Sequence, residues 1–181
     1  MNVHRKSLEE ILASDEIKNL AGVLGTGVAE DFNIEKLKYG KIIIMTDADV
    51  DGEHICTLLF TFFHLMCPNL ITHGHVYLAL PPLYKTQKKG SSKSQYFLNG
   101  DDINEAIPPA EQHKYDIQRF KGLGEMNPAQ LKETTMCKEN RTLLQLTWDL
   151  DAMDEVHKTF EVLMGEDVPP RRHAVYAEVD K

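Results

Sequence analysis

The spacing of apolar and polar residues predicts two helices at the start of the chain. Ser7 and Glu10 have the separation of a capping box, in which each side chain accepts a hydrogen bond from the other residue's backbone N–H. Apolar residues then recur at every third or fourth position over residues 8–12 and again over residues 17–24, as expected for one face of a helix. Two glycines follow at once and predict the end of the second helix.

The next predicted elements are a buried strand and a long helix, joined by an acidic loop. Residues 41–45 form a continuous run rich in isoleucine, which is typical of a strand buried on both faces of a parallel sheet. After Gly52 the spacing becomes helical and continues to Pro68, which ends the helix. Its apolar face comprises Ile55, Leu58, Leu59, Phe62, Phe63 and Met66, and its polar face comprises His54, Thr57, Thr61 and His64.

The second half of the sequence predicts shorter elements. Residues 75–80 have the composition of a strand that continues past a Pro-Pro kink, and a basic turn leads to a returning strand of a hairpin at residues 95–98. The order of elements predicts an α/β fold with a parallel sheet flanked by helices over residues 1–84, followed by a smaller α+β part over residues 85–181. The further elements expected are a strand at 116–120, a helix at 128–136, an edge strand at 143–148 and a helix at 151–164.

Composition and charge limit the classes of function. The chain has 181 residues, of which 42% are hydrophobic and 27% charged, as in ordinary globular proteins. Its formal net charge of −8 argues against a protein that binds nucleic acid through a basic face, although phosphate could be reached through a divalent metal or a basic partner subunit. Three widely spaced cysteines predict neither a disulfide framework nor a zinc site. With no signal-peptide or membrane-spanning pattern, we expect a cytoplasmic protein.

Three aspartates, Asp47, Asp49 and Asp51, stand at alternate positions directly after the predicted buried strand. Acidic residues at a helix N-terminus are stabilised by the free N–H groups there, by ~0.3–1 kcal/mol each, which would explain one or two of the three. Asp47 precedes any plausible helical turn, and carboxylates this close repel one another unless a cation is bound. The pattern therefore favours a divalent metal site over helix capping alone.

The residues around the aspartates narrow the choice of metal. A calcium-binding EF-hand loop starts with the same spacing, but it needs a Glu at its twelfth position and a preceding helix, where this chain has Leu58 and a strand. A phosphatase with an aspartyl nucleophile, of the haloacid dehalogenase type, would have Thr or Val in place of Asp51 and is the weaker alternative. Mg²⁺, which one or two carboxylates hold and which bridges to phosphate, suits phosphodiester cleavage or transfer.

The aspartate segment IIIMTDADVDGEHI closely resembles the TOPRIM domain in the B-type subunit of bacterial type IIA DNA topoisomerases, the family of DNA gyrase and topoisomerase IV. The resemblance covers nearly the whole chain and is weakest at residues 86–114. It implies a TOPRIM-like parallel sheet flanked by helices, followed by a C-terminal part with a KGLGE loop. Successive blocks of that family are matched in order by LAGVLGTGVAEDFNIEKLKYGK, LLFTFFHLMCPNLITHGHVYLALPPLYK, IQRFKGLGEMNPAQLKETTM and LMGEDVPPRR.

The resemblance implies roles for particular residues. Asp47 and Asp49 would hold Mg²⁺ at the DNA-cleavage site, and Asp51 would support them or bind a second ion. His54 would lie near the metals as a catalytic residue, and its alternative is a place on the polar face of the helix. The nucleophilic tyrosine would belong to the A-type subunit and to none of the six tyrosines here. The segment that approaches cleaved DNA would contribute Arg119, Lys121, Gly122 and Gly124, with Lys121 also catalytic.

Two departures from the family pattern affect these expectations. Cys56 stands where the family commonly has an arginine, which puts a phosphate contact there in doubt. The E-G-D-S strand, whose glutamate completes the metal site in the family, should precede residue 1, and neither it nor the ATPase region is in this sequence. We therefore expect an incomplete sheet with an apolar edge at residues 41–46, completed by a chain that brings both. The chain would be a natural split subunit or a shortened form of a longer one.

These inferences predict the Mg²⁺-binding part of an ATP-dependent type IIA topoisomerase, active only in a larger assembly with double-stranded DNA and the A-type subunit. The ATP would be bound by another region or chain. The alternative is a non-catalytic assembly module that docks the A-type subunit. The sequence does not distinguish gyrase activity from topoisomerase IV activity, because the two enzymes differ largely in how the A-type partner wraps DNA.

Overall fold

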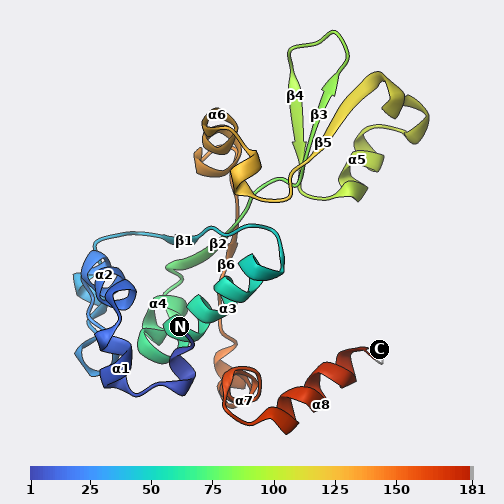
Figure 1. The fold of residues 1–181 in the computed structure, drawn as a ribbon. Coiled ribbons are helices and arrows are strands. Elements are labelled where there is room, and N and C mark those ends of the chain that lie inside the picture. The colour runs from blue at the N-terminus through green and yellow to red at the C-terminus, as the bar shows by residue number, and fades with distance from the viewer. Residues whose placement is uncertain (180–181) are drawn as a thin grey trace. The chain divides into compact units, whose positions relative to one another are not determined.

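The computed structural model describes residues 1–179 as a mixed α/β protein (Figure 1). Contacts divide the chain into two units. The first comprises residues 1–42, 57–76 and those from 145 onward, and the second comprises residues 43–56 and 77–144. Each unit is thus assembled from segments that are distant in the sequence. The domain boundary near residue 84 stays a prediction.

The first unit begins with the two helices that the sequence predicts, α1 (Leu8–Ala13) and α2 (Asp15–Leu24). The capping box is confirmed, because Ser7 Oγ accepts a hydrogen bond from the backbone N–H of Glu10 and the Ser7 N–H donates to Glu10 Oε2 at 3.0 Å. Gly25 ends α2 in the left-handed conformation, with φ of 79°. Glycine is favoured there because it has no Cβ to clash with the preceding carbonyl.

Three strands, β1 (Ile42–Ile44), β2 (Val76–Leu80) and β6 (Thr142–Gln145), form a sheet in the order β1-β2-β6. Strand β1 is therefore an outer strand of this sheet. Burial on both faces of β1 was expected, but only Ile44 is buried, while Ile42 and Ile43 are half-buried. A strand at the edge of a small sheet has fewer neighbours to cover it than an interior strand.

Helix α3 (Val50–Met66) is the long helix predicted after the aspartates, and α4 (Pro68–Thr72) follows it. Phe62 and Phe63 are buried as predicted. The predicted polar face is partly wrong, because Thr61 and His64 are also buried. Thr61 satisfies its hydroxyl within the helix by donating to the Thr57 carbonyl at 2.7 Å, which lowers the cost of burying it.

The chain ends in α7 (Met153–Met164), which the sequence predicts, and α8 (Val168–Val179), which it does not. Polar side chains from residues 1–5 and from α8 satisfy the free carbonyls at the end of α7. Asn2 Nδ2 and Arg5 Nε donate to the Met164 carbonyl at 2.9 and 3.1 Å. Arg5 Nη2 donates to the Gly165 carbonyl at 2.7 Å, and Arg171 donates to the same carbonyl. Cations at a helix C-terminus also interact favourably with the helix dipole and so stabilise the helix.

The second unit is built around an antiparallel sheet in the order β4-β3-β5, formed by β3 (Tyr84–Lys88), β4 (Ser94–Phe97) and β5 (Tyr115–Arg119). Tyr84 pairs with Phe97 on one side and with Arg119 on the other. The predicted hairpin is confirmed, with residues 84–88 as its first strand. Figure 1 shows β3 and β4 as a hairpin with β5 alongside.

Two helical segments complete the second unit. Helix α5 (Gly100–Ala106), absent from the sequence prediction, starts at Asn99, which forms a capping box with Asp102. Helix α6 (Pro128–Leu131) starts with the predicted proline and continues as a π-helical turn over Lys132–Met136. The helix expected over residues 128–136 is thus present, with a change of pitch in the middle.

A buried histidine lies in an aromatic cluster of the first unit. His64 is 2% exposed, and its ring stacks on Phe160 with centroids 4.3 Å apart. The ring centroids of Trp148 and His157 lie 5.2 and 4.6 Å from that of His64. Neither ring nitrogen of His64 has a hydrogen-bond partner among the residues described. Burial, and then the nearby charges of His157 and His4, lower the pKa of His64 to about 4.

This burial predicts an acid-sensitive stability. Between pH 6.5, the ordinary pKa of histidine, and about 4, the unfolded chain protonates His64 while the folded chain does not. The free energy of unfolding therefore falls as the pH is lowered through this window, by up to ~1.4 kcal/mol per unit. Urea unfolding followed by Trp148 fluorescence measures this. We expect His64→Phe to remove this share of the pH dependence, whereas the exposed His54→Gln keeps it. An unchanged pH profile in His64→Phe would contradict the assignment.

Candidate metal and nucleic-acid site

The three aspartates lie on the segment from β1 into α3, as predicted. Asp49 directly precedes α3, and its Oδ1 accepts a hydrogen bond from the Gly52 backbone N–H at 2.8 Å. This is the geometry of a helix N-cap. Asp51 lies in the first turn of α3, where the helix dipole favours a negative charge. Helix capping therefore accounts locally for Asp49 and Asp51 but not for Asp47.

Asp47 contacts a distant segment of the second unit, the loop of residues 121–125 with the sequence KGLGE. The backbone N–H of Leu123 donates to Asp47 Oδ1 at 2.6 Å, although the two residues are 76 positions apart. Gly122 lies against the same carboxylate, since a Cβ added to it would be 2.8 Å from Oδ1 and 3.2 Å from Oδ2. The structure thus joins two motifs that the sequence shows only separately.

The start of α3 packs closely against the backbone of Asp47. A Cβ added to Gly52 would lie 2.0 Å from the Asp47 carbonyl oxygen and 2.8 Å from its carbonyl carbon. Real Cβ atoms do not approach so closely, so only glycine fits without moving the backbone. Gly52 therefore lets the helix begin directly over the aspartate loop.

The KGLGE loop is anchored at both ends. Phe120, which precedes it, and Met126, which follows it, are buried. Glu125 closes the loop, because its Oε2 accepts a hydrogen bond from the Lys121 backbone N–H at 2.8 Å. Ala48 and Leu123 contribute to an apolar seam with these residues, around a cavity of only about 10 Å³. The loop therefore has a defined conformation beside the aspartates.

The predicted DNA contacts belong to one continuous segment that runs from β5 into this loop. Arg119 is exposed on β5, with its guanidinium carbon 5.9 Å from the centre of the Tyr84 ring across the β3–β5 pair. Such a contact holds a guanidinium by cation–π attraction while leaving its N–H groups available. Lys121 and Gly124 are also exposed, and Gly122 is half-buried against Asp47.

His54 and Cys56 differ in their surroundings. His54 is exposed on α3, and no hydrogen bond links it to Asp47 among the residues described. Cys56 is buried, with its Sγ 3.1 Å from the hydroxyl oxygen of Thr46. In this position the thiol faces the protein interior, and the doubt about a phosphate contact there stays a prediction.

The carboxylates present suit Mg²⁺ only as a partial set of ligands. Among the side chains that the structure describes, no group of three or more His, Cys, Asp or Glu residues is arranged to hold a metal. Asp47 and Asp49 each accept one backbone hydrogen bond on Oδ1, and a carboxylate retains further lone pairs after one such bond. Mg²⁺ is commonly bound by one or two carboxylates together with waters and phosphate. The site fits that mode and does not form a cage of protein ligands.

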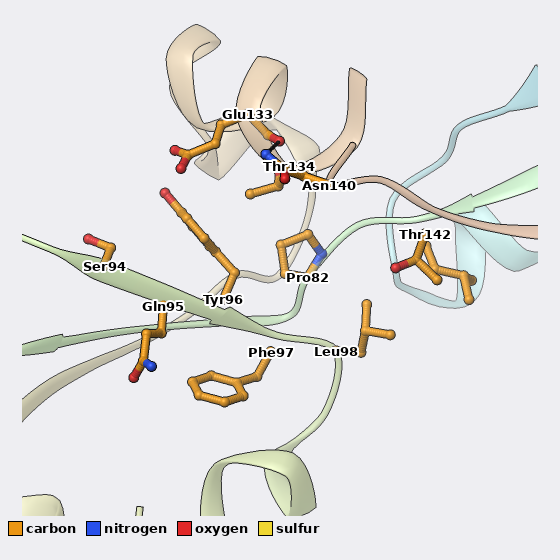
Figure 2. Close-up of a pocket in the computed structure, with 11 residues that line it drawn as sticks. Pro82, Ser94, Gln95, Tyr96, Phe97, Leu98, Glu133, Thr134, Asn140 and Thr142 are labelled. Carbon is orange, nitrogen blue, oxygen red and sulfur yellow. Dashed lines mark hydrogen bonds between the residues drawn. The ribbon is translucent and has the colours of Figure 1, made fainter. Parts of the chain in front are cut away.

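The second unit also has a polar pocket that sequence reasoning missed. It has a volume of about 320 Å³ and lies between β4 and the segment of α6 and its π-helical turn (Figure 2). In Figure 2 the Tyr96 side chain extends toward Glu133, with Asn140 and Thr134 nearby. Burial, and then the negative charge of Glu133, raise the pKa of Tyr96. Its residues come from segments that are far apart in the sequence, which explains why no local pattern predicts it.

Comparisons with known proteins identify the family. A model of the Toprim domain matches residues 4–81, and a model of the DNA gyrase B subunit carboxyl terminus matches residues 112–175. Proteins named as the B subunit of DNA gyrase are similar over almost the whole chain. Those of Halalkalibacterium halodurans, Clostridium acetobutylicum and Thermus thermophilus are 51%, 46% and 45% identical over 95%, 100% and 99% of this chain.

The chain is thus an α/β protein with a Toprim domain, and it belongs to the family of DNA gyrase B subunits. The resemblance predicted from the sequence is confirmed. The chain spans 26–29% of the length of these curated relatives, so it corresponds to one region of them.

The close contact at Gly52 predicts a marked loss of stability on adding a methyl group. Gly52→Ala forces the start of α3 away from Asp47, and we expect the free energy of unfolding to fall by about 1–3 kcal/mol. Gly22→Ala is the matched control, because Gly22 is also helical and has open space around its Cα. That variant should be neutral or more stable by up to ~1 kcal/mol. Denaturant unfolding of both measures the difference, and equal stabilities would contradict the packing at Gly52.

Proposed function

We propose that this chain is the Mg²⁺-binding part of a type IIA DNA topoisomerase, which supports cleavage and religation of double-stranded DNA. The observation that carries the proposal is the hydrogen bond from the Leu123 N–H to Asp47 Oδ1. It brings a carboxylate suited to a metal beside a segment whose exposed cations, Arg119 and Lys121, suit phosphate. The proposal is further supported by the relatives, which are named as B subunits of DNA gyrase.

In this proposal Asp47 and Asp49 hold Mg²⁺, and Asp51 supports them or binds a second ion. Each of the first two keeps one oxygen free of the backbone hydrogen bonds described above. When bound, the metal stabilises negative charge on the scissile phosphate and on the leaving oxygen. Asp49 has two roles, because the same side chain caps the N-terminus of α3 and binds the cation.

The chain's own cations position the DNA. Arg119 and Lys121 contact backbone phosphates, while Gly122 and Gly124 let the loop approach the strand closely. His54 and Lys121 act as catalytic residues near the metals. The nucleophile is a tyrosine of the A-type subunit, which joins covalently to the cleaved strand and is released on religation.

The remaining parts of the enzyme lie outside residues 1–181. They include an ATP-hydrolysing region and a strand whose glutamate completes the metal site. The outer strand β1 offers unpaired backbone groups on one side, to which such a strand can add.

We place the assembly in the cytoplasm. Within residues 1–179 no helix combines the length and apolar character needed to cross a bilayer.

A second candidate function is a non-catalytic module that docks the A-type subunit. It is favoured by one observation, namely that no group of three possible metal ligands is arranged among the side chains described. In that case the capping of α3 by Asp49 and the contact of Asp47 with Leu123 would be purely structural.

Substitution of the aspartates distinguishes the two functions. In the reconstituted complex, we expect Asp47→Ala to reduce Mg²⁺-dependent DNA cleavage at least a hundredfold, because a metal ligand is lost. Cleavage is measured on supercoiled plasmid, and assembly by size-exclusion chromatography. Unchanged cleavage would remove the enzymatic proposal, whereas lost cleavage with intact assembly would remove the docking alternative.

Asp49 allows capping and metal binding to be separated. Asn is as good an N-cap as Asp, so Asp49→Asn should keep the stability of α3, whereas Asp49→Ala should lose about 1 kcal/mol. Both variants should lose Mg²⁺-dependent cleavage, since neither has the charged ligand. Asp101→Asn is the control, because it removes an exposed carboxylate from the first turn of α5. Normal cleavage by Asp49→Asn would mean that Asp49 only caps the helix.

A further inference from the structure

We infer that the KGLGE loop acts as a positioning element for the metal ligand Asp47, with Gly122 and the backbone N–H of Leu123 fixing the orientation of its carboxylate. This inference rests on the proposed function, in which Asp47 binds the cation. It gives the loop a role in metal binding that is separate from any contact with DNA.

The first support is the geometry of the hydrogen bond to Asp47. The distance of 2.6 Å from Leu123 N to Asp47 Oδ1 is short for a bond from an amide to a carboxylate. An N–H at one oxygen of a carboxylate restricts its rotation and leaves the second oxygen for another ligand. Hydrogen bonds of this kind to a metal ligand orient it and commonly change metal affinity by about 10–100-fold.

The second support is the reason for glycine at position 122. Its φ of −168° lies in the extended region, which any residue adopts, so backbone conformation does not require glycine there. Space does. An added Cβ would lie 2.8, 2.9 and 3.2 Å from the Oδ1, Cγ and Oδ2 atoms of Asp47. The side chain of Asp47 would have to move by several tenths of an ångström to reach ordinary contact distances.

A third support is the contrast with the other glycine of the same loop. A Cβ added to Gly124 would have no heavy atom within 4 Å. Two glycines that look equivalent in the motif therefore have different surroundings, and only Gly122 touches the proposed ligand.

The loop is also held in place by contacts of its own. The side chain of Glu125 holds the Lys121 N–H, and buried Phe120 and Met126 fix the flanks. Because the Leu123 N–H belongs to this anchored segment, the donor that contacts Asp47 is held by contacts that do not involve the aspartates. A ligand arranged in advance loses less conformational freedom on binding.

The test compares Gly122→Ala with Gly124→Ala in the reconstituted complex. Binding of Mn²⁺, as a probe for the Mg²⁺ site, is measured by electron paramagnetic resonance, and Mg²⁺ affinity by competition. We expect Gly122→Ala to weaken Mn²⁺ binding about tenfold or more. Gly124→Ala, which the proposed function places beside the DNA, should keep the Mn²⁺ affinity of the wild type, and Gly22→Ala, outside the loop and the proposed site, should keep both Mn²⁺ affinity and DNA cleavage. In Gly122→Ala the Mg²⁺ concentration for half-maximal DNA cleavage should rise by the same factor, because the ligand is displaced rather than removed.

A second pair of variants tests the amide itself and covers the case that Gly122→Ala alters the fold. Leu123→Pro removes the N–H donor, at a position that follows an extended residue and begins a short 3-10 helix, both of which accept proline. Leu123→Ala keeps the N–H and removes only the side chain. Weaker Mn²⁺ binding is expected for Leu123→Pro and not for Leu123→Ala, with circular dichroism as the check on folding.

The outcomes separate this inference from the proposed function. If Asp47→Ala abolishes Mn²⁺ binding while Gly122→Ala and Leu123→Pro bind normally, the metal site stands and the positioning role is overturned. If Asp47→Ala itself binds Mn²⁺ as tightly as the wild type, the proposed metal site fails. Weaker binding in Gly124→Ala equal to that in Gly122→Ala would also overturn the inference, because the effect would then be a general response of the loop.

Discussion

The candidate site depends on one hydrogen bond, from the Leu123 N–H to the Asp47 carboxylate. A cluster of carboxylates at the end of a strand is unfavourable unless each charge is compensated. Here Asp47 is compensated by the loop N–H and Asp49 by the N–H of Gly52. Both donors are backbone groups of segments that contain glycine. Two backbone N–H groups therefore offset charge on these carboxylates, and each uses only the Oδ1 atom.

The close packing around Asp47 explains why glycine stands at two positions that contact it. Gly52 lets α3 begin directly against the Asp47 carbonyl, and Gly122 lets the loop reach the carboxylate. Neither glycine has a positive φ, so both are required by space. The aspartate loop is thus enclosed on two sides within the second unit, by the start of a helix and by a loop anchored through Phe120 and Met126.

This chain corresponds to only one region of its relatives, and that region supplies few candidate metal ligands. The structure joins Asp47 to a basic segment, and among the side chains that it describes no group of three or more possible ligands is arranged to hold a metal. An Mg²⁺ site of this kind depends on phosphate, water and a ligand from elsewhere. In the proposed function, this dependence would confine DNA cleavage to a complex in which DNA and the partner subunits are assembled. The outer position of β1 next to the aspartates gives the sheet a place where further structure can add.

The sequence by itself determined most elements and the family. The capping box at Ser7, the strand before the aspartates, the hairpin and the first proline of α6 follow from local patterns, because short-range hydrogen bonds and periodicity fix them. Helix α5 was missed although Asn99 and Asp102 form a capping box, and α8 was missed because its apolar residues follow no helical stripe. Only the tertiary structure decided that Thr61 and His64 are buried, that Tyr96 and Glu133 share a pocket, and that Leu123 holds Asp47. These contacts join residues far apart in the chain, and no local pattern of a single sequence records which distant backbone N–H will meet a given carboxylate.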